Sequence, residues 1–254
     1  MTHAANVWNK FCQRFNVVEQ SVPLFTTDAD GVVAHRMLGR TSRPILMRSP
    51  EMEALILVET DKLVEDWESR THRFDGLIYC MGERQGDQFI PLYIGKTETF
   101  GKGAGNLSAN IQNLKTEKSK FARWGDNYAY HVGDLSACVL PGHAEGKKTI
   151  KYQAWAEQLF VSVPSLMPKL HRPVYFWATA WDRSMTGVWE ELGPTSLAFQ
   201  EYLLIGVAGR VSPVLLNREG VGRGVGYERG SGFEVRPRLT IKARVYCSPI
   251  DQNE

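Results

Sequence analysis

Apolar residues recur with two different periods along the chain, and the change of period marks predicted helices and strands. Between Ser49 and Arg70 they recur about every 3.6 residues, after an N-cap serine and a proline at the first helical position, which is typical of an amphipathic helix. Phe74–Met81 and Ile90–Gly95 are short, apolar runs joined by a polar connector with two glycines. This pattern predicts an antiparallel β-hairpin.

Weaker patterns place further elements around this hairpin. Pro173–Trp181 is dense in β-branched and aromatic residues and predicts a third strand. Asp126–Leu140 fits either a strand or a loop, and Val163–Arg172, with two prolines, predicts a loop. Helices are predicted at Asn6–Phe15, Leu107–Lys120, Tyr152–Phe160 and Pro194–Val207, and a last strand is predicted at Phe233–Tyr246.

The order of these elements predicts an α+β fold, in which a small three-stranded sheet, mixed or antiparallel, is flanked by helices. We expect an N-terminal helical extension at 1–70, a core at 71–217, and a C-terminal region at 218–254 with a Gly/Arg-rich loop and a final strand. Hydrophobic residues make up 43% of the 254 positions, which is enough to bury a core.

Cysteine usage and apolar run lengths narrow the class of protein. The four cysteines show no C-x-x-C spacing and lie far apart, so neither a zinc ribbon nor a disulfide framework is supported. The first residues lack the apolar region of a signal peptide, and no run of about 18 apolar residues could span a membrane. We therefore expect a cytoplasmic protein without a membrane partner.

The charge is distributed unevenly, although the formal net charge is only +2. Gly95–Arg123 holds six basic and two acidic residues, and the chain from Arg210 onward holds eight basic and five acidic ones. Such stretches are either solvated faces or contacts to nucleic acid phosphates. The candidate DNA-binding residues are Lys102, Lys115, Lys118, Lys120, Arg218, Arg223 and Arg229.

The predicted hairpin carries two motifs that suggest a chemistry. Its first strand contains Gly76-Leu77-Ile78-Tyr79, and its second contains Tyr93-Ile94-Gly95-Lys96-Thr97. Together they resemble the signature of the GIY-YIG nuclease family, with Leu77 in place of the glycine of the first tripeptide. Gly95-Lys96-Thr97 does not end a Walker P-loop, because Ile90 occupies the position that requires glycine.

Later residues continue this resemblance in the same order, from Phe74 to Asn217. Arg123 stands where the family has a phosphate-binding arginine, and His131 follows it, as in the restriction-enzyme branch but at a longer spacing. Glu201, before an apolar pair, and Asn217, after a proline, resemble the metal-binding glutamate and the asparagine of the family. The residues near 135–172, between the arginine region and the third predicted strand, are then an insertion in this core.

The resemblance implies a DNA endonuclease that uses one Mg²⁺ or Mn²⁺ ion bound by Glu201. Tyr79 or Tyr93 would activate water, and the sequence does not decide between them. A tyrosine has an ordinary pKa near 10, so as a base it needs a nearby cation; Lys96 or His131 are the candidates. The partner would be double-stranded DNA, with either a homodimer or a single subunit acting, in a restriction enzyme or in a phage or mobile-element nuclease.

Other interpretations stay open at this point. The tyrosines are also ordinary strand residues, and Glu201 and Asn217 are also compatible with a helix surface and a turn. A second hypothesis is a nucleic-acid-binding module that has kept the fold but does not cleave. A third is a small-molecule enzyme, which would show no salt-dependent DNA binding.

Overall fold

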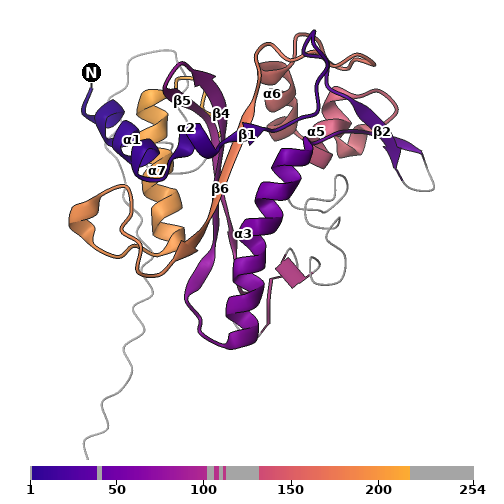
Figure 1. The fold of residues 1–254 in the computed structure, drawn as a ribbon. Coiled ribbons are helices and arrows are strands. Elements are labelled where there is room, and N and C mark those ends of the chain that lie inside the picture. Colours follow the sequence, from indigo (N-terminus) through magenta and orange to yellow (C-terminus); the bar gives the residue numbers. More distant parts are fainter. Residues whose placement is uncertain (1, 39–41, 102–105, 109–110, 113–131, 218–254) are drawn as a thin grey trace, which may run out of the picture. The chain divides into compact units, whose positions relative to one another are not determined.

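The computed structural model describes residues 2–38, 42–101, 106–108, 111–112 and 132–217, which belong to one compact unit (Figure 1). The described helices are α1 (His3–Arg14), α2 (Val17–Gln20), α3 (Pro50–Ser69), α5 (Val132–Val139), α6 (Ile150–Leu159) and α7 (Leu197–Val211), with short 3-10 turns at Glu145–Lys147 and Glu190–Leu192. The described strands are β1 (Val22–Pro23), β2 (His35–Leu38), β3 (Arg43–Leu46), β4 (Phe74–Gln85), β5 (Gln88–Glu98) and β6 (Tyr175–Asp182).

The main sheet is antiparallel throughout and has the strand order β1-β6-β4-β5. The predicted hairpin and third strand are present, with β4 in the centre. The sheet has four strands rather than the three expected, because Val22 and Pro23 pair with the start of β6. Strands β4 and β5 are longer than their apolar runs predict, so that only Gly86 and Asp87 form the turn between them. The α+β class is confirmed.

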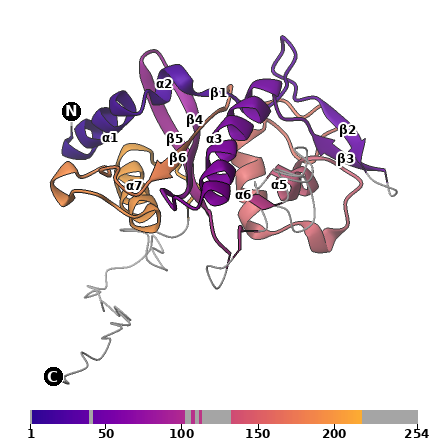
Figure 2. The ribbon, with the colours of Figure 1, turned by 60° about the horizontal axis from the view of Figure 1, so that its bottom comes forward.

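Helices cover both faces of this sheet (Figures 1 and 2). Leu77, Tyr79 and Met81 of β4 belong to the core beneath α3, α5 and α6, and we call this side the tyrosine face. Ile78 and Cys80 alternate with them and belong to the core beneath α1 and α7, which we call the α7 face. This alternation is the period-two geometry of a strand that is buried on both sides.

Helix α3 forms as predicted and crosses the tyrosine face. The side chain of Ser49 caps it by accepting a hydrogen bond from the Met52 amide at 2.9 Å, with Pro50 in the first turn. Glu59, only 8% exposed, accepts a hydrogen bond from the Ala180 amide of β6 at 2.7 Å and pairs with Lys62. A buried carboxylate therefore fixes the helix to the sheet.

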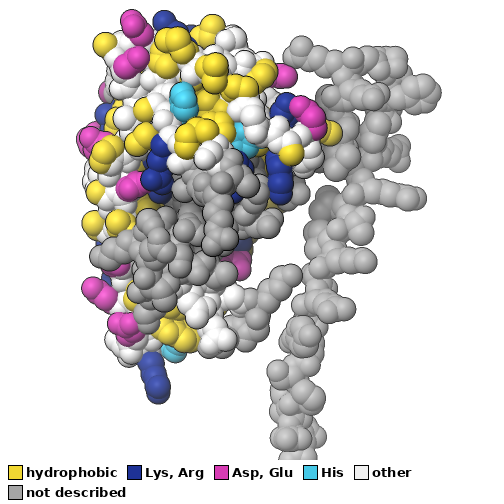
Figure 3. All heavy atoms as spheres, turned by 90° about the vertical axis from the view of Figure 1, so that its right-hand side faces the viewer, with side chains coloured by type: hydrophobic (Ala, Val, Ile, Leu, Met, Phe, Trp, Pro, Cys, Tyr) yellow, Lys and Arg dark blue, Asp and Glu magenta, His cyan; other side chains and the backbone are white. Residues whose placement is uncertain are grey.

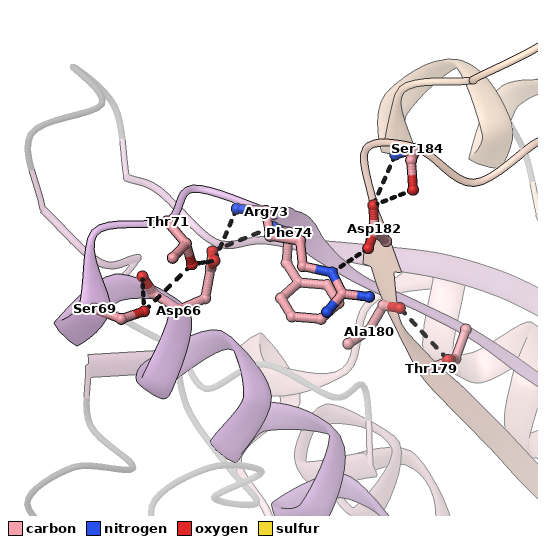
Figure 4. A network of polar contacts seen from close by, with 9 residues as sticks. All are labelled: Asp66, Ser69, Thr71, Arg73, Phe74, Thr179, Ala180, Asp182 and Ser184. Carbon is pink, nitrogen blue, oxygen red and sulfur yellow. Dashed lines mark hydrogen bonds and ion pairs between the residues drawn. The ribbon is translucent and has the colours of Figure 1, made fainter.

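A polar network joins the end of α3, the start of β4 and the end of β6 (Figure 4). Asp66 accepts hydrogen bonds from the Thr71 hydroxyl and from the amides of Arg73 and Phe74, the last two at 2.8 and 3.2 Å. Asp182 accepts bonds from the amide and hydroxyl of Ser184 and pairs with Arg73. These contacts provide hydrogen-bond partners for backbone amides where the chain turns sharply.

Two elements differ from the sequence prediction. Val132–Val139, which the pattern left between strand and loop, is the helix α5, and its buried Leu135, Cys138 and Val139 recur at helical spacing. The two-stranded sheet of β2 and β3 was not predicted, because four-residue strands are too short to show a period. Most of the predicted helix Leu107–Lys120 and the predicted strand Phe233–Tyr246 lie outside the described residues.

Among the described residues, Cys12, Cys80 and Cys138 are free thiols, as expected for a chain without a disulfide framework. Burial, with a smaller contribution from Glu19, raises the pKa of Cys12 to about 12, and burial raises the pKa of Cys80 well above its ordinary value. Both thiols therefore stay protonated and are poor nucleophiles. None of the described helices has the length and apolar character needed to cross a membrane.

Candidate functional site

The two tyrosines of the hairpin motifs lie on neighbouring strands and on the same face of the sheet. Tyr79 on β4 is paired with Gly95, and Tyr93 on β5 is paired with Met81. Partners across an antiparallel pair share a face, so both phenols belong to the tyrosine face. Their ring centroids are 6.3 Å apart. Tyr79 is only 4% exposed and stacks on Phe176, whereas Tyr93 is partly exposed.

Gly95 is the residue over which the Tyr79 ring lies. A Cβ atom at position 95 would be closer than 3.0 Å to the ring and to the hydroxyl oxygen of Tyr79. A residue without a side chain is therefore needed where the first tyrosine crosses the second strand. This contact gives a physical reason for glycine as the third residue of the Tyr93-Ile94-Gly95 motif.

Tyr93 lies beside an aromatic and cationic cluster that helix α6 supplies. The ring of Trp155 is 4.7 Å from the ring of Tyr93, centroid to centroid. The ammonium group of Lys151 is 5.1 Å from the centroid of Tyr93, 5.3 Å from that of Tyr152 and 5.6 Å from that of Trp155. These are cation–π distances, and they place a positive charge next to the Tyr93 ring.

Sequence reasoning did not identify Lys151. The sequence predicted only a short helix at Tyr152–Phe160, which begins after Lys151, and nothing in the local pattern shows that this helix packs against β5. The only available signal was the co-occurrence of Lys151, Tyr152 and Trp155 on one turn, which is common on helix surfaces.

Asn217 binds the backbone of the second hairpin motif. Its side-chain oxygen accepts a hydrogen bond from the Ile94 amide at 2.9 Å, and its side-chain nitrogen donates one to the Ile94 carbonyl at 2.8 Å. The Leu216 amide donates to the Leu92 carbonyl at 2.7 Å, so that the chain after α7 runs along β5. Asn217 is 7% exposed, and this pair of bonds fixes it against the motif.

Lys96 and Glu201 are not brought to the tyrosines. Lys96 is paired with Ile78 of β4, which belongs to the α7 face, and its ammonium group pairs with Glu98. Lys96 is one of the two cations that the sequence offers for a tyrosine, and alternation along β5 directs its side chain to the other side of the sheet. Glu201 is partly buried on α7, which packs against that same opposite face.

Several predicted site residues lie outside the described part of the chain. They are Arg123, His131, Lys102, Lys115, Lys118, Lys120, Arg218, Arg223 and Arg229. The described site thus consists of the tyrosine pair, Gly95, the α6 cluster and Asn217, with Glu201 on the far face of the sheet.

The residues that the structure describes contain no group of three or more His, Cys, Asp and Glu side chains arranged to hold a metal ion. The resemblance implies instead that the single carboxylate of Glu201, with water, would hold the ion, and this donor suits Mg²⁺, which keeps several water ligands and is often held by one or two carboxylates.

Comparison of the chain with protein-family models, with curated proteins and with solved structures found no match. The resemblance to the GIY-YIG family accordingly rests on the motif residues and on the contacts described above.

Proposed function

We propose that this protein is a metal-dependent DNA endonuclease of the GIY-YIG type. The observation that carries the proposal is the pair of hydrogen bonds between Asn217 and Ile94. The resemblance includes both motifs in one ordered series, and although the two residues are 123 positions apart, the structure brings them into contact. It adds to the shared face of Tyr79 and Tyr93 on neighbouring strands.

In this proposal Tyr93 is the residue that activates water. Tyr79 is almost fully buried and stacked between Gly95 and Phe176, which leaves little room for a water molecule and a phosphate at its hydroxyl. Tyr93 is more exposed, and the Lys151 ammonium group lies 5.1 Å from its ring. A nearby positive charge favours the phenolate form, which is the form that can accept a proton from water.

The remaining roles come from the resemblance. Arg123 would bind a nonbridging phosphate oxygen with its planar guanidinium group. Glu201 would hold Mg²⁺ or Mn²⁺, and the bound ion would supply positive charge for the oxygens of the scissile phosphate. The resemblance does not account for the position of α7 on the face opposite the tyrosines, so the role of Glu201 needs its own test.

Cleavage of mixed plasmid and phage DNA in the presence of Mg²⁺ tests the proposal directly. The wild type is expected to give discrete fragments if it is a restriction-type enzyme, and EDTA should abolish them. Tyr93→Phe removes one hydroxyl group and should lower the cleavage rate by about 10²- to 10⁴-fold, the usual contribution of a general base. Tyr202→Phe, on the exposed side of α7, is the matched control and should leave the rate unchanged.

Two outcomes would contradict the proposal in different ways. A folded wild type that binds DNA but cleaves none, with either metal, would favour the non-cleaving binding module. Full cleavage by Glu201→Ala would show that the metal ion is bound elsewhere, while leaving the role of the tyrosines in place.

A further inference from the structure

The chain between α6 and β6 carries an exposed apolar loop at residues 161–169. Leu166 and Met167, which are neighbours in the sequence, are 69% and 70% exposed, and Val161 in the same loop is 54% exposed. Figure 3, which looks at the side of the molecule that carries α5 and α6, shows hydrophobic side chains gathered toward the top of that face. Contiguous apolar surface of this kind tends to mark a contact with another molecule.

Backbone hydrogen bonds hold this loop against two neighbouring segments. The Ser165 amide donates to the Val139 carbonyl at the end of α5, at 2.8 Å. On the other side, the Val33 amide donates to the Pro168 carbonyl at 2.9 Å. A partner that packs on the loop does not have to order it first, which lowers the entropic cost of binding.

A cavity of about 290 Å³ adjoins the loop. Pro23, Phe25 and Val174 are among its apolar lining residues, and Asp30 and Lys169 also line it. Lys169 is both the last residue of the loop and part of the cavity wall, so the projection and the hollow belong to one surface. Such a surface has the shape needed to pair with a second copy of itself.

Charges of both signs surround the loop and the cavity. Lys169 is exposed, and Asp28 and Asp30 are exposed in the adjoining turn, which pairs with the loop through an antiparallel bridge. Arg172 is paired with Glu83 at 3.0 Å. These five side chains have a formal charge of 2 − 3 = −1. DNA and anionic lipids bind surfaces with an excess of positive charge, so this surface suits another protein instead.

We propose that this surface is the interface of a two-fold symmetric homodimer. In such a dimer the same surface lies on both subunits, so every contact between two different residues is made twice. Met167 of each subunit would fill the cavity of the other, and Lys169 of each would pair with Asp30 of the partner subunit. An apolar anchor in a pocket, with charged groups at the rim, is the common arrangement in protein interfaces.

The dimer proposal does not depend on the nuclease proposal. If both hold, the dimer supplies a second active site for the second DNA strand. The apolar loop and the cavity provide only part of the roughly 800 Å² per partner that a standard interface buries, so the dimer is expected to dissociate in the micromolar range.

Sedimentation velocity of the full chain, over a micromolar concentration series, measures the monomer–dimer equilibrium. Met167→Asp places a carboxylate in the partner's apolar cavity and should raise the dissociation constant by at least about tenfold. Leu192→Asp is the matched control: this leucine is 54% exposed and lies beyond the opposite end of β6. Thermal unfolding of both variants checks the fold.

Charge reversal at the rim tests the two-fold symmetry. Lys169→Glu alone and Asp30→Lys alone each place like charges opposite one another twice, so each variant should be largely monomeric. An equimolar mixture of the two should dimerise again, because both rim contacts of the mixed dimer then join opposite charges.

Three outcomes would overturn the dimer proposal. They are a wild type that stays monomeric at the highest concentration, a Met167→Asp variant that dimerises as Leu192→Asp does, and a mixture of the two charge variants that stays monomeric although the wild type dimerises. Because sedimentation is measured without DNA, failure of this proposal leaves the nuclease proposal to its own cleavage assay.

Discussion

The ring and hydroxyl group of Tyr79 lie over Gly95, at a distance that leaves no space for a Cβ atom. Tyr79, from the motif on β4, and Gly95, from the motif on β5, are therefore in direct steric contact. It holds the Tyr79 ring between strand β5 and Phe176, and it sets the position of the neighbouring Tyr93 ring, 6.3 Å away.

Gly95→Ala is expected to destabilise the protein by about 1–3 kcal/mol, the usual cost of adding a methyl group to a packed core. Tyr79 is 4% exposed, so its ring cannot move out to make space. Thermal or denaturant unfolding measures the change. Gly146→Ala is the control, since a Cβ there meets no atom within 4 Å. Equal stability of the two variants would show that the ring does not lie over Gly95.

Asn217→Ala should lower the free energy of unfolding by about 1–3 kcal/mol, because it removes two hydrogen bonds to the Ile94 backbone. Asn217→Asp should be at least as harmful, since its carboxylate would face the Ile94 carbonyl that now accepts a bond. Urea unfolding of both variants provides the measurement. Gln153→Ala, at an exposed position of α6, is the comparison. If Asn217→Ala unfolds at the same urea concentration as Gln153→Ala, the contact contributes nothing to stability.

The sequence predicted those parts of the fold whose signals are local and strong. Helix α3 has an N-cap, a proline at its start and a regular apolar period, and the hairpin has two β-prone runs with a short connector. Strands β1 and β2–β3 have two and four residues each, so no period is visible in them. Their pairing depends on partners far along the chain, which one sequence does not reveal.

The candidate site, like the fold, was predicted only in part. Tyr79, Tyr93 and Asn217 were identified through motif order, and the structure brings them to one region of β4 and β5. Lys151 was missed because its contact with Tyr93 depends on how α6 packs. Lys96 was one of two candidate cations for a tyrosine, although strand alternation already assigns residues 93 and 96 to opposite faces.

Acid is expected to destabilise the junction of α3, β4 and β6. Burial alone would raise the pKa of Asp66 and of Asp182, but the hydrogen bonds that each accepts, and Arg73 beside Asp182, outweigh it and lower both pKa values from 3.8. A lowered folded-state pKa stabilises the protein above the unfolded value, and this contribution disappears as the pH falls below 3.8 through the folded-state values.

The free energy of unfolding, measured at a series of pH values from neutral downward, checks this prediction. The wild type should lose stability below pH 3.8, and Asp66→Asn or Asp182→Asn should be less stable at neutral pH and show a flatter decline. Asp87→Asn, in the exposed β4–β5 turn, serves as the reference and should follow the wild type. A decline that is as steep in both carboxylate variants as in the wild type would assign the acid sensitivity to other groups.

Lys151 and Tyr93 should act as one unit in the proposed reaction. If the ammonium group assists by favouring the Tyr93 phenolate, Lys151→Met slows cleavage in the wild-type background, and Lys151→Arg, which keeps the charge, restores much of the rate. In a Tyr93→Phe background there is no phenol to assist, so adding Lys151→Met should change the residual rate very little. Single-turnover cleavage of plasmid DNA by the four combinations of these two substitutions measures the coupling. Rate losses that simply multiply would instead show that Lys151 contacts the DNA directly, and a loss of affinity in the Lys151→Met single variant would then accompany them.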